Sequence, residues 1–470
     1  MSNIRHDFLS EIFFEMNFVI GPTWSHKNML EFIQKHEQLT PQEKIYMMNH
    51  IRNDMHLIRH SGETLKTSCL YCQSKLTSEY SCVNCIREVL KKNFKNWTSG
   101  NKTLDYCMQQ FQLYSLNSKN ARKLIEWVSI EKFLNLVHIK DGGFGSVYLA
   151  HWYEGPIAKW DEFNRNFIRY GATKVALKSM KNSKMNSEKF INEALSHMAL
   201  TIDSRALVSC YGLTREPNTD NIMLILDYKS VGDLTRYLNS DIPLTWKERY
   251  RILYYISISL VLIHDKGMVH RDLHPGNVLL KKSAWFVSDL GLCSFVDESS
   301  ELYGVIPYMS PEVLYEAKYT PKADIYSLGI IMWQLLTKRV PYNNFKYDDI
   351  QLSINIYKGL RPENIYGLPS EASDYIELME KCWDHDMNLR PNAQEIHDFV
   401  KNKLQKIFKG ELIIPEVERT LELISEPLND FSVQKNIDKE KIRNAIEQQI
   451  QLDSSGFALP KHIEIDNIFQ

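Results

Sequence analysis

The sequence predicts an α+β fold in which a small, sheet-rich lobe precedes a larger helical lobe. From about residue 138 to 228, segments rich in β-branched and aromatic residues indicate an antiparallel sheet: HIKDGGFGSVYLAHW, TKVALKSM and NIMLILDY. After about residue 233, helical spacing of apolar residues takes over in DLTRYL, WKERYRILYYISISLVLIHDKG and DIYSLGIIMWQLLT. With 44% hydrophobic residues the chain can bury a sizeable core. Two such lobes leave a cleft between them, and ligands usually bind in clefts.

The net charge and the hydropathy of the sequence argue against nucleic acid and membranes as partners. The formal net charge of −2 provides no overall attraction for nucleic acid or anionic membranes. Lys91, Lys92 and Lys95 form a local basic stretch, which we interpret as a solvated helix face rather than a nucleic-acid site. No apolar run approaches the roughly 20 residues that cross a bilayer, and charges interrupt the N-terminal stretch where a signal peptide would be apolar. We therefore expect a soluble, cytoplasmic protein without membrane or nucleic-acid partners.

Changes in texture divide the 470 residues into five predicted segments. They are a helical N-terminal segment (1–65), a zinc-ribbon-like module (66–97), a helical linker (98–129), the two-lobed domain (130–405) and a C-terminal tail (406–470). Within the domain, residues 152–172 form an aromatic-rich connection that we interpret as a surface insertion. In the loosely ordered tail, the spacing of Ile442, Ile446 and Ile450 predicts one short amphipathic helix.

Four of the eight cysteines form two Cys-x-x-Cys pairs, Cys69 with Cys72 and Cys82 with Cys85. In a reducing compartment such pairs indicate a metal site rather than disulfides. The arrangement resembles a zinc ribbon or knuckle, in which four thiolates close a tetrahedral Zn²⁺ site. Free or redox-active cysteines are the alternative. Partner docking and simple stabilisation are both open as the role of this module.

A glycine-rich turn joins the first two predicted strands. Gly142, Gly143 and Gly145 remove side chains from the turn, so that backbone N–H groups can approach a phosphate closely, and Val147 follows in the next strand. A glycine hairpin without a ligand is the alternative for this turn in isolation. A dinucleotide-binding turn is disfavoured, because its glycines would lead from a strand into a helix.

Cations and carboxylates follow the turn in a set order. The strand VALK ends in Lys178, which can hold phosphates, and Glu193 in the predicted helix KFINEALSHMAL can anchor it. Each is a plausible surface charge by itself. The segment HRDLHPGN then supplies Asp272, which can orient a hydroxyl, and Asn277, which can turn towards Mg²⁺. Asp289 in SDLG supplies a further hard oxygen ligand.

In this order the motifs resemble those of the protein-kinase superfamily, over more than half of the chain. The resemblance implies the bilobal protein kinase fold, ATP and Mg²⁺ as cofactors, and transfer of the γ-phosphoryl group to a protein hydroxyl. It assigns Asp272, Lys178 and Glu193 to catalysis, Asn277 and Asp289 to Mg²⁺, and Gly142, Gly143, Gly145, Val147, Lys178, Asp227 and Tyr228 to the nucleotide. It also implies a gating Leu226 in the hinge, a buried Glu312–Arg390 ion pair, and Asp324 as a brace for the catalytic loop.

The text VALK, HRDL, GVIPYMSPE and CW most resembles the tyrosine-kinase-like group, whose members mostly phosphorylate serine and threonine. The two Cys-x-x-Cys pairs beside this text also resemble expanded kinase families of some fungi. The resemblance implies a protein substrate carrying a serine or threonine hydroxyl and a role in intracellular signalling. A pseudokinase that binds nucleotide or partners as a scaffold is the main alternative, and a zinc-dependent adaptor is another.

Four residues depart from the family pattern. Lys140 stands in place of the first loop glycine, and Leu290 in place of a phenylalanine. His274 stands where serine/threonine kinases carry a lysine that neutralises the transferring phosphate, and Val305 where they carry a threonine. Histidine is a weaker cation than lysine at neutral pH, so slow turnover and an altered hydroxyl specificity are expectations.

Arg271 precedes the catalytic aspartate and suggests control by phosphorylation of the activation loop, because a loop phosphate can pair with this cation. Ser299, Ser300 and Tyr303 are the candidate acceptors, and solvent-facing hydroxyls without this role are the alternative.

Overall fold

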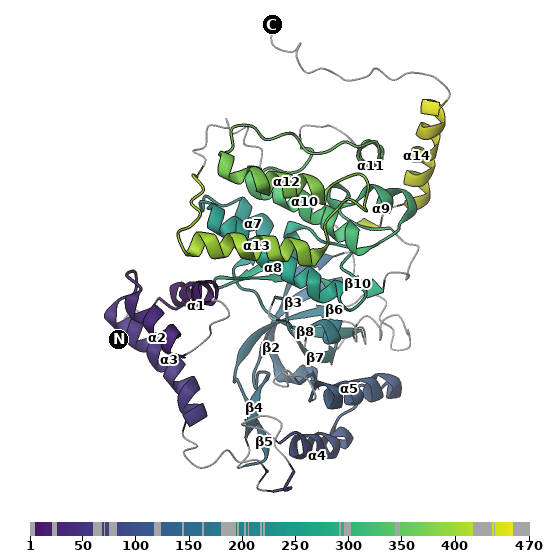
Figure 1. Ribbon diagram of the computed structural model, residues 1–470. Coiled ribbons are helices and arrows are strands. Elements are labelled where there is room, and N and C mark those ends of the chain that lie inside the picture. The colour runs from purple at the N-terminus through teal and green to yellow at the C-terminus, as the bar shows by residue number, and fades with distance from the viewer. Residues whose placement is uncertain are drawn as a thin grey trace.

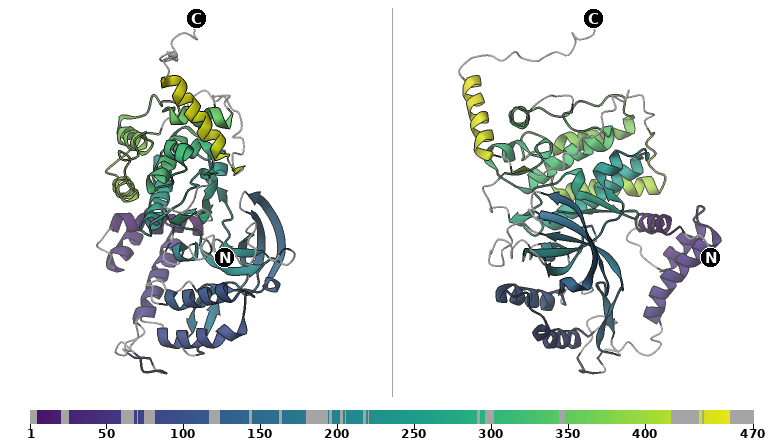
Figure 2. Two further views of the ribbon diagram at one scale, coloured as in Figure 1. Left: turned by 90° about the vertical axis from the view of Figure 1, so that its right-hand side faces the viewer. Right: turned by 180° about the vertical axis from the view of Figure 1, so that it is seen from behind.

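The protein was analysed as a computed structural model (Figure 1). The structure describes residues 5–20, 26–59, 68–69, 71–74, 82–116, 124–142, 145–161, 164–179, 194, 197–201, 204, 206–216, 219, 221–290, 293–295, 302–343, 348–416, 435–436 and 438–454. The chain forms a sheet-rich small lobe and a helical large lobe, which confirms the predicted fold class (Figures 1 and 2). None of the described helices is both long and apolar enough to cross a membrane.

The small lobe is a six-stranded sheet with the strand order β1-β7-β8-β6-β3-β2. Its strands are β1 (Glu126–Trp127), β2 (Phe133–Gly142), β3 (Gly145–Trp152), β6 (Thr173–Ser179), β7 (Cys210–Arg215) and β8 (Ile222–Asp227). All neighbours pair antiparallel except β1, which runs parallel to β7. One apolar face, with Val175, Leu177 and Ile225 fully buried, packs on Trp152 and Phe133.

The other face of the sheet is covered by a helix from the predicted linker. In α5 (Lys102–Ser115), Leu104 and Met108 are buried in one cluster with Ala194 and Met198, residues of the segment predicted to carry Glu193. The linker is therefore part of the small-lobe core, and its last residues form strand β1. α4 (Val83–Asn93) lies beside α5 at the end of the small lobe farthest from the large lobe (Figures 1 and 2).

The predicted surface insertion at 152–172 contains a β-hairpin. Its strands β4 (Ile157–Asp161) and β5 (Asn166–Arg169) pair antiparallel. Trp160 and Phe167 pack against α4 rather than facing solvent alone. The insertion therefore connects the sheet to the cysteine-containing segment.

The large lobe is built around α8 and α10, whose apolar side chains are buried nearly all round. Its helices are α7 (Leu234–Leu238), α8 (Trp246–His264), α9 (Pro311–Glu316), α10 (Pro321–Thr337), α11 (Asp349–Tyr357), α12 (Ser373–Cys382) and α13 (Ala393–Phe408). Its short strands are β9 (Gly232–Asp233), β10 (Met268–Val269), β11 (Val278–Lys281), β12 (Ala284–Val287), β13 (Ser294–Phe295) and β14 (Tyr303–Gly304). Side-chain caps at Asp233, Thr245, Asp348 and Asn392 satisfy backbone N–H groups at four helix starts.

The N-terminal segment folds as predicted into helices, α1 (His6–Ile20), α2 (His26–Lys35) and α3 (Pro41–Arg59). α1 is attached to the large lobe by aromatic side chains. The Phe14 ring stacks on Tyr255 at 5.5 Å between centroids, and Phe18 lies 5.4 Å from Phe408 of α13. Because Phe18 is buried in the main core of the large lobe, this segment is packed onto the lobe rather than tethered to it.

The predicted helix of the C-terminal tail is present as α14 (Lys439–Ser454), preceded by strand β15 (Lys435–Asn436). Ile442 and Ile446 are 2% and 1% exposed and belong to the core of the large lobe, where α14 packs on α9 and α11. Ile450 is 40% exposed. Two of the three isoleucines that predicted the amphipathic helix are therefore buried.

Candidate functional site

Lys178 and Asp289 meet where the two lobes face each other. Lys178 lies in the buried C-terminal part of β6, and its ammonium group contacts Asp289 Oδ1 as a hydrogen-bonded ion pair. Burial alone would raise the pKa of Asp289, but the Lys178 charge and hydrogen bond lower it to about 2. Asp289 is therefore ionised at neutral pH. Glu193, the predicted partner of Lys178, lies outside the described residues.

Asp272 and Asn277 lie together in the loop after β10. Asn277 Nδ2 donates hydrogen bonds to the carbonyl oxygen and to Oδ2 of Asp272, both at 2.9 Å. His274 Nε2 lies 3.5 Å from Asp272 Oδ2. Burial raises the pKa of Asp272, but the neighbouring His274 more than offsets it, so the net pKa is lowered. A buried carboxylate held by an amide and an imidazole results.

Asp324 of α10 holds the loop that carries Asp272 by accepting hydrogen bonds from its backbone. Asp324 Oδ2 accepts from the His270 N–H at 2.8 Å, and Oδ1 accepts from the Arg271 N–H at 3.0 Å. His264 Nε2 lies 2.8 Å from the same carboxylate. The predicted brace is confirmed: one buried carboxylate satisfies two consecutive backbone donors, which fixes the direction of Asp272.

Backbone geometry links this loop to Asp289. The Ser288 N–H and hydroxyl both donate to the Asn277 carbonyl, at 2.8 and 3.0 Å. Arg271 and Asp289 adopt left-handed backbone conformations, with φ of 71° and 59°. Such values are costly for residues with a β-carbon and occur where surrounding contacts over-determine them, often at functional sites.

The predicted phosphate loop lies at the β2–β3 turn. Gly142 and Gly145 are paired residues at its ends, and Gly143 lies outside the described residues. Val147 is the cross-strand neighbour of both Lys140 in β2 and Lys178 in β6. The turn therefore sits above the Lys178–Asp289 pair, and the Lys140 charge also contributes to the lowered pKa of Asp289.

The predicted hinge begins in the last two residues of β8. Leu226 is buried, and the Asp227 N–H donates to the Ser209 carbonyl at 2.9 Å, so this N–H is already used within the protein. The Asp227 carboxylate holds Lys229 at 2.8 Å and Lys281 at 2.6 Å. Tyr228, which lies between Asp227 and Lys229 in the sequence, is half-buried.

Two buried residues, one in the hinge and one beside the Lys178–Asp289 pair, were not identified from the sequence motifs. The Lys229 ammonium is buried 3.2 Å from the centre of the Phe286 ring, a cation–π contact that fastens the hinge to β12. His197 is 2% exposed beside Lys178 and Asp289; burial lowers its pKa to about 4, and the Lys178 charge adds to the effect. Its position four residues after Glu193 in the predicted helix KFINEALSHMAL was the available signal.

Glu312 and Arg390 form the predicted ion pair. Arg390 Nη1 and Nη2 contact the two carboxylate oxygens of Glu312 at 2.7 and 2.9 Å, and the Arg390 side chain is fully buried. Its Nε donates to the Asp384 carbonyl at 2.8 Å. This bidentate pair joins α9 to the segment before α13.

The activation segment lies between Asp289 and Glu312. Ser299 and Ser300 lie outside the described residues. Tyr303 is in β14, where its N–H donates to the Tyr319 hydroxyl at 2.8 Å and its carbonyl accepts from the same hydroxyl at 2.7 Å. The Arg271 guanidinium lies 5.0 Å from the centre of the Tyr319 ring. Phosphorylation in this segment stays a prediction.

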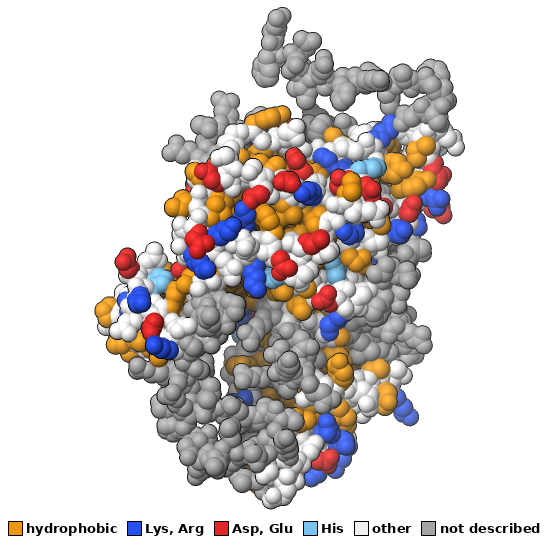
Figure 3. All heavy atoms as spheres, viewed as in Figure 1, with side chains coloured by type: hydrophobic (Ala, Val, Ile, Leu, Met, Phe, Trp, Pro, Cys, Tyr) orange, Lys and Arg blue, Asp and Glu red, His pale blue; other side chains and the backbone are white. Residues whose placement is uncertain are grey.

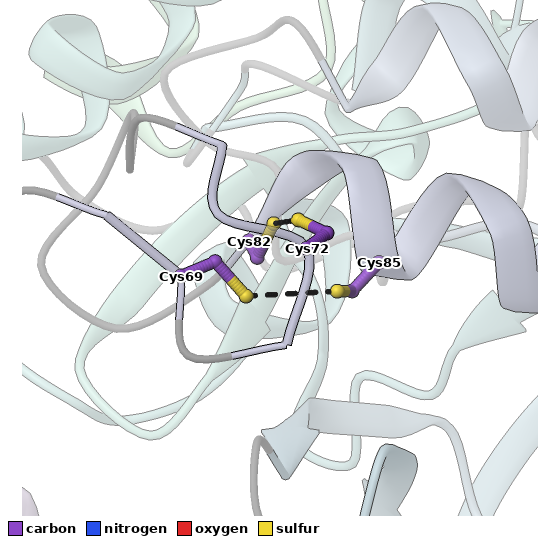
Figure 4. Close-up of side chains that lie close together, drawn as sticks. All are labelled: Cys69, Cys72, Cys82 and Cys85. Atoms are coloured by element: carbon purple, nitrogen blue, oxygen red, sulfur yellow. Dashed lines mark hydrogen bonds between the residues drawn. The ribbon is translucent and has the colours of Figure 1, made fainter.

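The four paired cysteines come together in a single cluster (Figure 4). Cys69 Sγ lies 3.7 Å from Cys85 Sγ, and Cys72 Sγ lies 3.3 Å from Cys82 Sγ. All four sulfur atoms are within 4.8 Å of one another, and none forms a disulfide. A tetrahedral site with Zn–S bonds of about 2.3 Å has sulfur atoms about 3.8 Å apart, so the donor set fits Zn²⁺.

The surroundings of the cluster affect its cysteines in different ways. The Tyr71 N–H donates to Cys69 Sγ at 3.4 Å, and hydrogen bonds from Ser74 lower the pKa of Cys72 to about 6. Burial raises the pKa of Cys85. Trp160 from the β4–β5 hairpin packs on the cluster.

The basic stretch on α4 and the segment after it is solvated. Lys91, Lys92 and Lys95 are exposed, and Lys91 lies 3.6 Å from Glu88. On the described part of the face drawn in Figure 3, acidic and basic side chains are interspersed over the large lobe. The absence of a nucleic-acid partner stays a prediction.

Known proteins resemble this chain over the two lobes. The family model described as protein tyrosine and serine/threonine kinase matches residues 134–400. The human ankyrin repeat and protein kinase domain-containing protein 1 is 28% identical over 55% of this chain and 36% of its own length. The human receptor-interacting serine/threonine-protein kinase 4 is 32% identical over 40% of this chain and 24% of its own length, and its mouse counterpart is 30% identical over 43% and 27%. The chain thus spans about a quarter to a third of these relatives.

Proposed function

The chain belongs to the family of protein tyrosine and serine/threonine kinases, and we propose that it transfers the γ-phosphoryl group of ATP to a protein hydroxyl. The observation that carries the proposal is the convergence of Lys178, Asp272, Asn277 and Asp289 at the junction of the lobes. These four side chains come from distant parts of the chain and supply one cation, two carboxylates and an amide.

The donor set suits a magnesium nucleotide. Carboxylate and amide oxygens are hard ligands of the kind Mg²⁺ prefers, and a buried ammonium group suits phosphate. Asn277 and Asp289 would hold the metal, and Lys178 would hold the phosphates, with Glu193 as its proposed anchor. MgATP, when bound, supplies the phosphoryl group and neutralises part of its charge.

Asp272 would orient the attacking hydroxyl and accept its proton. Its lowered pKa keeps the carboxylate ionised at neutral pH, while Asn277 and the Asp324-braced backbone fix its direction. Lys178 now pairs with Asp289, so nucleotide binding would require this ion pair to open. Gly142, Gly143, Gly145 and Val147 would cover the phosphates, and the hinge around Asp227 and Tyr228 would contact the adenine.

We propose serine or threonine as the acceptor, because the curated relatives include receptor-interacting serine/threonine-protein kinases. Membership of the tyrosine-kinase-like group, the likeness to fungal families, the cytoplasmic location and the five domain boundaries all stay proposals. His274 and Val305 still argue for slow turnover or altered specificity.

We also propose that Cys69, Cys72, Cys82 and Cys85 bind a structural Zn²⁺. The sulfur spacing supports this, and so does the small size of the surrounding cluster, in which Trp160 is the one large apolar side chain that the described part of the chain contributes. Docking of a partner protein on this module is a further proposal without a specific contact behind it.

The test of kinase activity is transfer of labelled phosphate from ATP with Mg²⁺ to a mixed serine, threonine and tyrosine substrate. Asp272→Asn is the matched control, because it keeps the side-chain shape and removes the base. We expect at least a hundredfold lower transfer by the variant, with nucleotide binding retained. Equal transfer by both proteins would exclude the proposed mechanism, and nucleotide binding without transfer by the unmodified protein would favour the pseudokinase.

A further inference from the structure

A short strand from the C-terminal flank pairs with the activation segment. β15 (Lys435–Asn436) runs antiparallel to β14 (Tyr303–Gly304), with Asn436 opposite Tyr303 and Lys435 opposite Gly304. β14 has no other strand neighbour among the described residues. The edge of the activation segment is therefore occupied by this chain's own polypeptide.

The paired edge lies against the loop that carries Asp272. A β-carbon placed on Gly304 would lie 3.6 Å from the carbonyl oxygen of Arg271, the residue before Asp272. Gly304 has a φ of 136°, which favours glycine, so the backbone conformation at this position depends on the missing side chain, while 3.6 Å is an ordinary van der Waals contact. A polypeptide paired with β14 is thus held close to the loop that would act on a hydroxyl.

A small pocket extends from the same place. It is lined by Asp272 and His274 of the catalytic loop, by Val305 and Tyr308 after β14, and by Ser327 of α10. The pocket begins one residue beyond Gly304 on the activation segment. An extended peptide on β14 can therefore place a side chain in it, as in other cases of strand addition.

Two residue pairs cannot hold a strand in place by themselves. The adjoining helix supplies the anchor. Ile442 and Ile446 bury α14 against α9 and α11, and the Arg443 guanidinium lies 5.9 Å from the centre of the Tyr315 ring in α9. Because α14 starts three residues after β15, the strand has a high effective concentration at β14.

We propose that the β14 edge is the docking edge for the extended protein substrate, and that Lys435–Asn436 occupies it as an intramolecular competitor. The proposal rests on the proposed kinase function. Competition of this kind raises the apparent KM for the protein substrate and leaves the nucleotide site unchanged. If the pairing of β15 with β14 only stabilises the fold, removing the strand would instead leave the peptide KM unchanged.

The test uses the full chain and a synthetic serine/threonine peptide. Lys435→Pro/Asn436→Pro removes both strand N–H groups without touching the buried face of α14, and Lys435→Ala/Asn436→Ala is the matched control that keeps them. We expect the proline variant to lower the peptide KM roughly fivefold or more, with kcat and the ATP KM within about twofold. The alanine variant should behave as the unmodified chain, and an unchanged peptide KM in the proline variant overturns the proposal.

A second variant acts on the anchor. Ile442→Asp/Ile446→Asp should release α14 and lower the peptide KM in the same way, whereas Ile450→Asp should not. If the anchor variant does not fold, the proline variant decides alone.

Hydrogen exchange separates failure of this proposal from failure of the proposed function. A chain without kinase activity would contradict the function, but amide exchange at Gly304, the residue opposite Lys435, can still be compared. Faster exchange in the proline variant than in the alanine variant supports the strand contact. Equal exchange in both, like an unchanged KM, overturns it.

Discussion

Helix α4, which carries Cys85 of the cysteine cluster, and helix α14 of the C-terminal flank lie at opposite ends of the molecule and are attached by different means (Figures 1 and 2). At the C-terminal end, α14 inserts two isoleucines into the core of the large lobe. Beside α4, the cysteine cluster has Trp160 as its one packed large side chain among the described residues. Two buried side chains can hold α14 on the lobe without a cofactor, while the small cysteine cluster needs a cross-link, which here is the proposed Zn²⁺.

The N-terminal flank nevertheless reaches the catalytic lobe. α4 packs beside α5, and α5 shares a buried cluster with Ala194 and Met198. The C-terminal flank reaches the activation segment through β15. Each flank therefore contacts a different part of the catalytic domain, and the two contacts can be disturbed separately.

The largest effect is expected from removing the zinc ligands. Cys69→Ser/Cys85→Ser should abolish binding of one Zn²⁺ per chain, because structural sites contribute about 10–16 kcal/mol of apparent binding free energy. Native mass spectrometry should report the lost metal, and hydrogen exchange should rise in α4 but not in α14. Cys107→Ser, outside the cluster, is the control and should retain zinc. Zinc-free protein from zinc-containing medium would favour the redox alternative.

The next largest effect is expected from the buried Glu312–Arg390 ion pair. Glu312 lies in α9, the helix on which α14 packs. Arg390→Ala leaves Glu312 without its cation and should cost about 3–5 kcal/mol of unfolding free energy. Exchange should rise in α9 and in α14, which packs on it, and thermal unfolding should shift down. Arg390→Lys keeps a charge but loses the bidentate geometry, so it should be intermediate. Equal loosening of α4 would mean that the two flanks are one cooperative unit.

A smaller effect is expected at the anchor of α14. Ile446→Ala should cost about 2 kcal/mol or more of docking free energy, since the side chain is 1% exposed. Limited proteolysis after α13 should become faster. Ile450→Ala, at 40% exposure, should stay within about 0.5 kcal/mol. Similar proteolysis rates for the two variants would contradict docking through the buried face.

The smallest effect is expected in the catalytic loop between the flanks. His274→Lys places a permanent cation near the transferring phosphoryl group and should raise kcat about three- to tenfold, which corresponds to roughly 1 kcal/mol. His274→Gln provides no charge and should not raise kcat. Steady-state kinetics at pH 7 is the measurement, and a slower lysine variant would mean that His274 has a role of its own beside Asp272.

Much of the catalytic site could be predicted from sequence because its constraints are local. HRDLHPGN sets Asp272 and Asn277 five residues apart, and the loop geometry then brings the amide to the carboxylate. The bilobal fold followed in the same way from a change in hydrophobic period. The Glu312–Arg390 pair is long-range, and it was reached through the family resemblance rather than through the residues themselves.

Other contacts could not be predicted, because they depend on which surfaces meet. Lys178 pairs with Asp289, which the motif order did not indicate. The insertion contributes Trp160 to the cysteine cluster, and the linker helix buries Met108 in the small lobe. A buried lysine such as Lys229 is indistinguishable in sequence from a solvated one.

Residue types at short spacings were enough to indicate the family, the two-lobed architecture and the candidate catalytic and metal-binding side chains. Only the tertiary structure decided that α14 is anchored in the large lobe and that Lys435–Asn436 lies along the activation segment. The two-residue strand β15 is too short to show a hydrophobic periodicity. It pairs with β14 because the anchored helix α14 places it there.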